Sequence, residues 1–240
     1  MSLDALFFGA HPDDVELTSG GLATLLASHG HAVGLVDLTR GEAASRGSPD
    51  QRAREAEQAA RLLGIPLRGN LGLPDLGLDA SDRAQQIAVV ETLRSHRPRL
   101  VVAPEADDAH PDHVAASHLI ARACTLAGFV RFEASGERFR PTRLLFALYR
   151  STRRPHLVVD VSGVWDRRMQ ALRSHASQLE PGPGPATYLA HPEFLGEVES
   201  RARVFGASIG ARYGEGYRMR GPVPIEDARA LLSTAPELPR

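Results

Sequence analysis

The chain has no lysine, a single cysteine and no long apolar run, and each absence excludes a class of protein. Since all 28 basic residues are arginine, the chain offers neither a Schiff-base lysine nor the lysine of a phosphate-binding P-loop. The one cysteine, Cys124, excludes an intrachain disulfide and a multi-cysteine zinc site. No stretch approaches the roughly 20 apolar residues that a membrane-spanning helix needs.

The charge balance and the first residues point to an ordinary soluble protein. The net charge of -1 gives no reason to expect nucleic acid or another polyanion as a partner. The N-terminal residues lack a basic segment and lead directly into strand-like sequence, which is not typical of a signal peptide. We therefore expect a cytoplasmic protein with no membrane association.

Apolar runs of strand length alternate with segments of helical periodicity. The predicted strands are Leu3–Phe8, Ala32–Leu38, Leu67–Leu73, Leu100–Ala103, Leu144–Tyr149 and Leu157–Val161. The predicted helices are Leu17–Ser28, Arg52–Leu63 with its start at Ser48–Gln51, Asp82–His96, Val114–Leu126, Gly163–Leu179 and Pro192–Phe205. The alternation predicts an α/β, Rossmann-like three-layer fold with a mostly parallel central sheet, in one domain over residues 1–240. A loop rich in proline and glycine, Glu180–Ala186, is a candidate lid or subunit contact.

The tripeptide His-Pro-Asp occurs twice, and each copy follows a predicted strand and precedes a predicted helix. The first copy, His11–Asp13, is followed by Asp14, and the second, His110–Asp112, is followed by His113. Because the carboxyl ends of parallel strands meet at one edge of a sheet, we expect both copies in one crevice. Histidine and carboxylate are ligands that a borderline metal such as zinc takes. The candidate ligands are His11, Asp14, His110 and His113, with Asp13 and Asp112 as additional carboxylates.

A metal at this edge would leave a position for a water molecule. A catalytic zinc takes three protein ligands and lowers the pKa of a bound water to about 7. A lone His-Pro-Asp is more often a loop with a capping aspartate, so the doubling at matched positions carries the prediction. The two motifs by themselves identify neither the metal nor the reaction.

The segment Ala10–Glu16 (Ala-His-Pro-Asp-Asp-Val-Glu), together with His110–His113, resembles the PIG-L (LmbE-like) zinc-dependent N-acetylglucosamine deacetylases. Within that family the chain is most similar to the bacillithiol-pathway enzymes that deacetylate N-acetylglucosaminyl-malate. The supporting similarities are Asp37–Glu42, Arg52 with Glu55, Leu73–Asp75, Val159–Ser162, Phe205–Gly206 and Tyr213–Gly216.

The resemblance implies a zinc-dependent amidohydrolase that removes acetyl from an N-acetylglucosamine conjugate, with N-acetylglucosaminyl-malate as the expected substrate. The implied ligands of zinc, or of ferrous iron in vivo, are His11, Asp14 and His113. Asp13 would be the general base toward the zinc-bound water. His110 would be the general acid that protonates the leaving amine, and Asp112 would orient it.

The resemblance also assigns substrate contacts. Arg52 and Asp75 match positions that contact the sugar and its appended group, and an arginine fork suits a carboxylate such as malate. Pairing of Arg52 with Glu55 at helical spacing is the alternative. Two departures from the close relatives leave the aglycone open between malate, inositol and another group. Ala109 stands where the relatives carry arginine, and this chain has no hydroxyl near Phe194, where they tend to have a tyrosine. The family likeness further implies a homo-oligomer, often a hexamer.

Two other functions stay open. A two-metal phosphoesterase would place its ions about 4 Å apart among bridging carboxylates. Those carboxylates would be Asp13, Asp14, Asp107, Asp108 and Asp112. A Rossmann-like sugar- or nucleotide-binding module is disfavoured because no Gly-x-Gly-x-x-Gly follows the first strand. Most of the histidines outside the motifs are expected at the surface: His29, His31, His96, His118, His156 and His175.

Overall fold

The structure is a computed structural model that describes residues 2–151, 153–182 and 185–221. Residues 183–184 of the predicted loop Glu180–Ala186 lie outside the described ranges. The strands are β1 (Ala5–Gly9), β2 (Val33–Thr39), β3 (Leu67–Leu73), β4 (Leu100–Pro104), β5 (Arg143–Ala147), β6 (Leu157–Asp160) and β7 (Gly214–Met219). The helices are α1 (Asp14–Thr18), α2 (Gly20–Ser28), α3 (Pro49–Leu63), α4 (Arg83–His96), α5 (Pro111–Leu126), α6 (Trp165–Arg173), α7 (Ala176–Leu179) and α8 (Phe194–Ala207), with a 3-10 turn η1 (Ser162–Val164).

The strands form one sheet in the order β3-β2-β1-β4-β5-β7-β6. In the described ranges six strands run parallel to one another, and β7 pairs antiparallel with β5 and β6. This confirms the predicted α/β fold with a mostly parallel sheet. From β1 the chain continues through β2 and β3 to one edge of the sheet, and it then returns to form β4 and β5 on the other side of β1. A ligand crevice is expected at the point where the strand order reverses in this way, beyond the carboxyl ends of β1 and β4.

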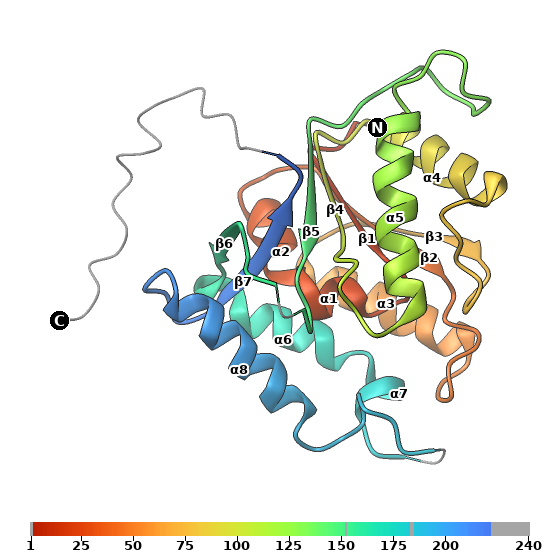
Figure 1. Cartoon of the computed structure of the whole chain (residues 1–240). Helices are drawn as coiled ribbons and strands as arrows, with labels where there is room; N and C mark the ends of the chain where they lie inside the picture. Colours follow the sequence, from red (N-terminus) through yellow and green to blue (C-terminus); the bar gives the residue numbers. More distant parts are fainter. Residues whose placement is uncertain (1, 152, 183–184, 222–240) are drawn as a thin grey trace.

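Alternate side chains of β1 enter two separate apolar layers. Leu6 and Phe8 pack with the buried side chains of α4 and α5, whereas Ala5 and Phe7 pack with those of α2, α3 and α6. Such alternation is what the two-residue period of a strand requires when helices cover both faces of a sheet. Figure 1 shows α4 and α5 on one side of the sheet and α2 and α6 on the other. No helix in the described part of the chain combines the length and apolarity needed to cross a bilayer.

The helices that border the sheet edge have clear local start signals. At α3, the Ser48 side chain accepts a hydrogen bond from the backbone N–H of Gln51, and Pro49 takes the first helical position. At α5, His110 is the N-cap and Pro111 the first helical residue. The second His-Pro-Asp-His therefore spans the N-cap and first turn of a helix, rather than the loop before it.

Three local predictions differ from the structure. The predicted helix Leu17–Ser28 is two helices that meet at Ser19, and the predicted helix Gly163–Leu179 is divided into η1, α6 and α7. The strand β7 was not predicted from the sequence, because its two glycines interrupt the apolar pattern. A Cβ on Gly216 would lie 2.8 Å from the ring of Phe205 on α8, so close packing of the helix on this strand requires a glycine there.

Candidate metal and catalytic site

The first motif occupies a tight and strained turn between β1 and α1. A Cβ on Gly9 would lie 2.9 Å from the His11 carbonyl oxygen and 3.0 Å from Cβ of Asp14, so glycine is needed for the chain to fold back. Asp13 has a φ of 141°, which is rare for a residue other than glycine. Such conformations cost about 1–3 kcal/mol and concentrate at functional sites. The turn thus holds Asp13 in a position that an unconstrained chain would avoid.

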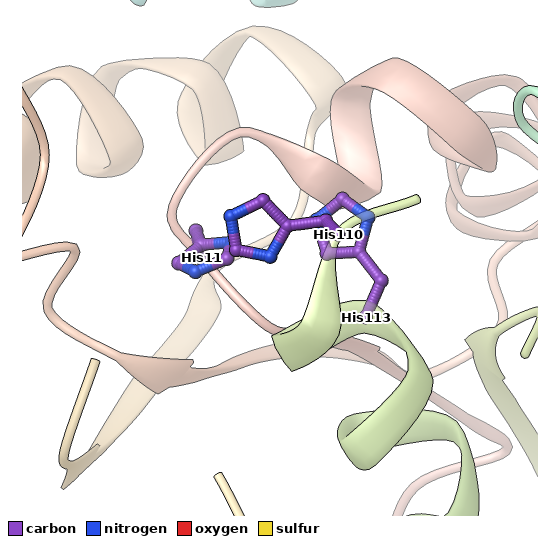
Figure 2. A group of neighbouring side chains, drawn as sticks. All are labelled: His11, His110 and His113. Carbon is purple, nitrogen blue, oxygen red and sulfur yellow. The ribbon is translucent and has the colours of Figure 1, made fainter. Parts of the chain in front are cut away.

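The structure brings the two distant motifs together (Figure 2). The ring centroids of His11 and His110 are 4.8 Å apart, those of His110 and His113 are 4.7 Å apart, and those of His11 and His113 are 5.4 Å apart. Each ring contributes a nitrogen to a set within 4.8 Å of one another. His11 comes from the turn after β1, and the other two come from the start of α5. The expected convergence at one sheet edge is therefore present.

Asp14 lies between two of these rings. Its Oδ2 is 3.5 Å from Nδ1 of His11, and its Oδ1 is 3.2 Å from Nε2 of His113. Oδ2 also accepts a hydrogen bond from the backbone N–H of His11, which fixes the carboxylate relative to the turn. One nitrogen of each ring therefore points to the same carboxylate.

The other nitrogen of each ring meets an outer carboxylate. Nε2 of His11 is 3.1 Å from Asp75 and 3.4 Å from Asp112, and Nδ1 of His113 is 3.0 Å from Asp108. Histidines that bind metals through one nitrogen usually donate a hydrogen bond from the other to a carboxylate or carbonyl. Asp75, predicted as a substrate contact, faces His11 in the structure. His11, Asp75 and Asp112 also bring oxygen and nitrogen atoms within 4.8 Å of one another.

The electrostatics of this centre favour a positive charge. Burial lowers the pKa of His11, but hydrogen bonds with three surrounding carboxylates outweigh burial and raise this pKa to about 12. Burial likewise lowers the pKa of His113, and Asp14 and Asp108 outweigh it and raise this pKa to about 10. Burial would raise the pKa of Asp14, but His113 and His11 hold it well below its usual value. Two imidazoles and a carboxylate amid surplus negative charge fit a divalent cation such as zinc.

The side chain of Arg52 is buried against Asp13. Its Nη2 is 3.4 Å from Oδ1 of Asp13, and its Nη1 donates a hydrogen bond to the Gly41 carbonyl. Burial raises the pKa of Asp13, and the charge of Arg52 offsets part of that rise. The Glu55 carboxylate accepts hydrogen bonds from the backbone N–H and hydroxyl of Ser177, so the helical-spacing alternative for Arg52 is not what the structure shows. Arg52 instead contacts the predicted general base.

His110 lies beside the metal-ligand candidates and is half-buried. Its Nδ1 accepts a hydrogen bond from the backbone N–H of Asp112 at 3.2 Å. Burial lowers the pKa of His110, as do the positive charges of His113 and His11. The carboxylate of Asp112 accepts instead from the backbone N–H of Leu76 at 2.7 Å. Asp112 therefore orients His110 through its backbone, while its carboxylate holds the neighbouring loop and borders His11.

A buried charge cluster under the site was not predicted from the sequence. Arg68 on β3 makes two hydrogen bonds of 2.9 Å to Asp37 on β2 and a third to Glu16 on α1. Nε2 of His175 lies 3.5 Å from Glu16, and both side chains are fully buried. The expectation that isolated histidines lie at the surface is therefore wrong for His175. Charged residues inside apolar strands were the available sequence signal.

Comparison with known proteins gives a family match that contains both motifs. A model of the family described as "PIG-L: GlcNAc-PI de-N-acetylase" matches residues 6–124. Among curated proteins, a diacetylchitobiose deacetylase of Thermococcus kodakarensis is 28% identical over 220 residues, covering 87% of this chain and 79% of that protein. A 1D-myo-inositol 2-acetamido-2-deoxy-alpha-D-glucopyranoside deacetylase of Rhodococcus opacus is 26% identical, covering 76% of this chain and 84% of that protein.

The match to a solved structure extends over nearly the whole chain. The conserved protein TT1542 from Thermus thermophilus is 36% identical, with a TM-score of 0.86. The alignment covers 94% of this chain and 98% of that one. The shared fold therefore includes the C-terminal strands as well as the motif-bearing half.

Proposed function

Because this chain belongs to the PIG-L family of de-N-acetylases, we propose that it is a metal-dependent hydrolase that removes the acetyl group from an N-acetylglucosamine conjugate. The observation that carries the proposal is the meeting of Asp14 with one nitrogen each of His11 and His113. The curated relatives are deacetylases of acetylated sugars and sugar conjugates, which supports the same reaction here.

The residues that would hold the metal are His11, Asp14 and His113. Two imidazole nitrogens and one carboxylate oxygen suit zinc, with ferrous iron as the alternative. When bound, the ion would polarise the acetamide carbonyl and make a water molecule more acidic. Carboxylates on the outer nitrogens of both rings would hold each ring in the orientation that binding requires.

Asp13 is the proposed general base toward the attacking water. Burial raises its pKa, and a carboxylate with a raised pKa accepts a proton more readily at neutral pH. Arg52 at 3.4 Å limits that rise and holds the carboxylate in place. In this proposal Arg52 positions the base, whereas the resemblance gave it a substrate contact.

His110 is the proposed general acid toward the leaving amine. Because its Nδ1 accepts a hydrogen bond from a backbone N–H, the proton of the neutral ring sits on Nε2. To act as an acid, the ring must first take up a second proton on Nδ1, which breaks this hydrogen bond, and can then give the Nε2 proton to the leaving amine. Burial and the charges of His113 and His11 lower its pKa, which favours release of that proton.

The proposed substrate is N-acetylglucosaminyl-malate, and the support for malate is the segment resemblance. Inositol and a second sugar are the alternative aglycones, which the names of the curated relatives favour. Burial of Arg52 against Asp13 removes one expected partner of the malate carboxylate, and Ala109 removes another. The aglycone is therefore the part of the proposal that an assay must decide.

A primary-amine release assay tests the proposal. Metal-free protein would be given N-acetylglucosamine conjugates of malate, inositol and a second N-acetylglucosamine, with and without zinc or ferrous ion. We expect release that depends on metal, with about one ion per chain. Asp13→Asn should retain the metal and lose nearly all turnover, whereas Asp50→Asn, at an 80% exposed side chain, should retain both. Release that is indifferent to chelators would contradict the proposal, and two ions per chain with phosphate release from phosphoesters would favour the phosphoesterase.

Three broader proposals follow, and the resemblance supports the first and the last of them. We propose that residues 1–240 form one deacetylase domain, that the enzyme acts in the cytoplasm, and that it is a homo-oligomer, with a hexamer as the first candidate. Light scattering on the purified protein measures the last of these, and the mass of a single chain would contradict it.

A further inference from the structure

Asp108 contacts both histidines of the second motif. It lies in the loop between β4 and α5, and its side chain is 12% exposed. Its Oδ1 accepts a hydrogen bond from the backbone N–H of His110 at 2.8 Å. Its Oδ2 lies 3.0 Å from Nδ1 of His113. One carboxylate therefore holds the backbone of one histidine and the ring of the other.

The contact with Oδ2 determines the tautomer of His113. An ionised carboxylate can only accept hydrogen bonds, so Nδ1 of His113 must carry a proton. In the neutral ring, Nε2 then presents its lone pair toward Asp14, 3.2 Å away. In the opposite tautomer Nε2 would carry the proton, and it could not bind a metal ion.

We propose that Asp108 is a positioning residue that selects the Nδ1–H tautomer of His113 and so directs Nε2 to the metal position beside Asp14. This inference rests on the proposed function, because it takes His113 as a metal ligand. It assigns Asp108 a role that neither the motif pattern nor the two-metal alternative gave it.

Asparagine at this position is a sharp test because it has the same shape and the wrong polarity. If its carbonyl oxygen accepts from the backbone of His110, its amide N–H groups face Nδ1 of His113 and favour the opposite tautomer. If the amide turns over, two donors meet at the backbone N–H of His110. Either orientation loses one contact, whereas a purely space-filling role would tolerate asparagine.

The experiment compares Asp108→Asn with Asp107→Asn by competition of each metal-free protein with a chelating dye for zinc. Asp107 is the adjacent carboxylate, and it accepts a hydrogen bond from Ser151. We expect Asp108→Asn to weaken zinc binding about 10- to 100-fold. We expect Asp107→Asn to change it within about twofold. Equal affinities for Asp108→Asn and the unaltered protein, or equal losses for the two variants, would overturn the inference.

Long-range 1H–15N spectra of the zinc-loaded protein provide a readout that does not depend on turnover. In the unaltered protein His113 should carry hydrogen on Nδ1 and metal on Nε2, and the reverse assignment would overturn the inference. Should Asp108→Asn fold poorly, the double variant Asp108→Ala, His113→Ala is compared with His113→Ala alone. Without the His113 ring, removal of Asp108 should cause no further loss of zinc affinity, and a further loss would contradict a role through His113. Full zinc affinity in His113→Ala alone would instead contradict the proposed ligand set.

Discussion

Replacing Arg68 with methionine would test the charge cluster under the site. Arg68 pairs with Glu16 and Asp37, and none of the three side chains is more than 6% exposed. Since one guanidinium serves two carboxylates, its removal leaves Asp37 without its arginine partner and Glu16 with only the imidazole of His175 beside it, where water does not reach. Loss of one partner from a buried ion pair costs about 3–5 kcal/mol. The melting temperature should then fall by roughly 6–20 °C for a chain of this length.

Thermal unfolding of the metal-free variants at pH 7.5 and pH 5 measures this effect. The matched control is Arg61→Met, because Arg61 also pairs with a glutamate, Glu57, but both side chains are more than two-thirds exposed. That variant should lose less than about 0.5 kcal/mol. The deficit of Arg68→Met should shrink at pH 5, because burial raises the pKa of Asp37 to about 6 and protonation removes an uncompensated charge. Equal losses in the two variants, or a deficit of Arg68→Met that is the same at both pH values, would refute the reasoning.

Three further predictions concern single positions. Since the folded pKa of Asp37 is about 6, above its unfolded value, Asp37 stabilises the fold more at pH 4 than at pH 8. Urea unfolding should show that Asp37→Asn costs about 2 kcal/mol more at pH 4 than at pH 8, and a pH-independent cost would contradict this. In Gly41→Ala, the new Cβ would lie 1.8 Å from Nη1 of Arg52 and displace it from the base, so kcat should fall about tenfold or more with unchanged metal content. Gly30→Ala, also at positive φ but with nothing within 4 Å, should keep full activity. Burial raises the pKa of the Cys124 thiol to about 12, and only the thiolate reacts with a thiol reagent. The reagent should therefore label Cys124 about a thousandfold more slowly in the folded protein than in urea. Fast labelling of the folded protein would argue against burial.

Much of the fold follows from local patterns. Strand β3 has the predicted bounds, Leu67–Leu73, helix α3 begins within the predicted start Ser48–Gln51, and the start of α4 differs from the prediction by one residue. These elements are encoded by residues close together in the chain: apolar runs for strands, and capping residues such as Ser48 and Asp82 for helices. Local encoding is the reason that a single sequence suffices for them.

Strand β7 shows where local patterns fail. Its Glu215 is buried and accepts hydrogen bonds from the backbone N–H groups of Gly21 and Leu22 at the start of α2, 194 and 193 residues away. A glutamate between two glycines resembles a loop in the sequence. It belongs in a sheet only because β5, β6 and a helix N-terminus surround it.

The sequence by itself determined which residues have the chemistry for a metal site, because two His-Pro-Asp motifs each stand between a strand and a helix, and parallel strands end at a common edge. The tertiary structure alone decided how those residues are used. It turned Nδ1 of His11 and Nε2 of His113 to Asp14, brought Arg52 to Asp13, and set Asp108 against His113. Ring orientation and tautomer depend on contacts between segments far apart in the chain, and no local pattern of residues specifies such contacts.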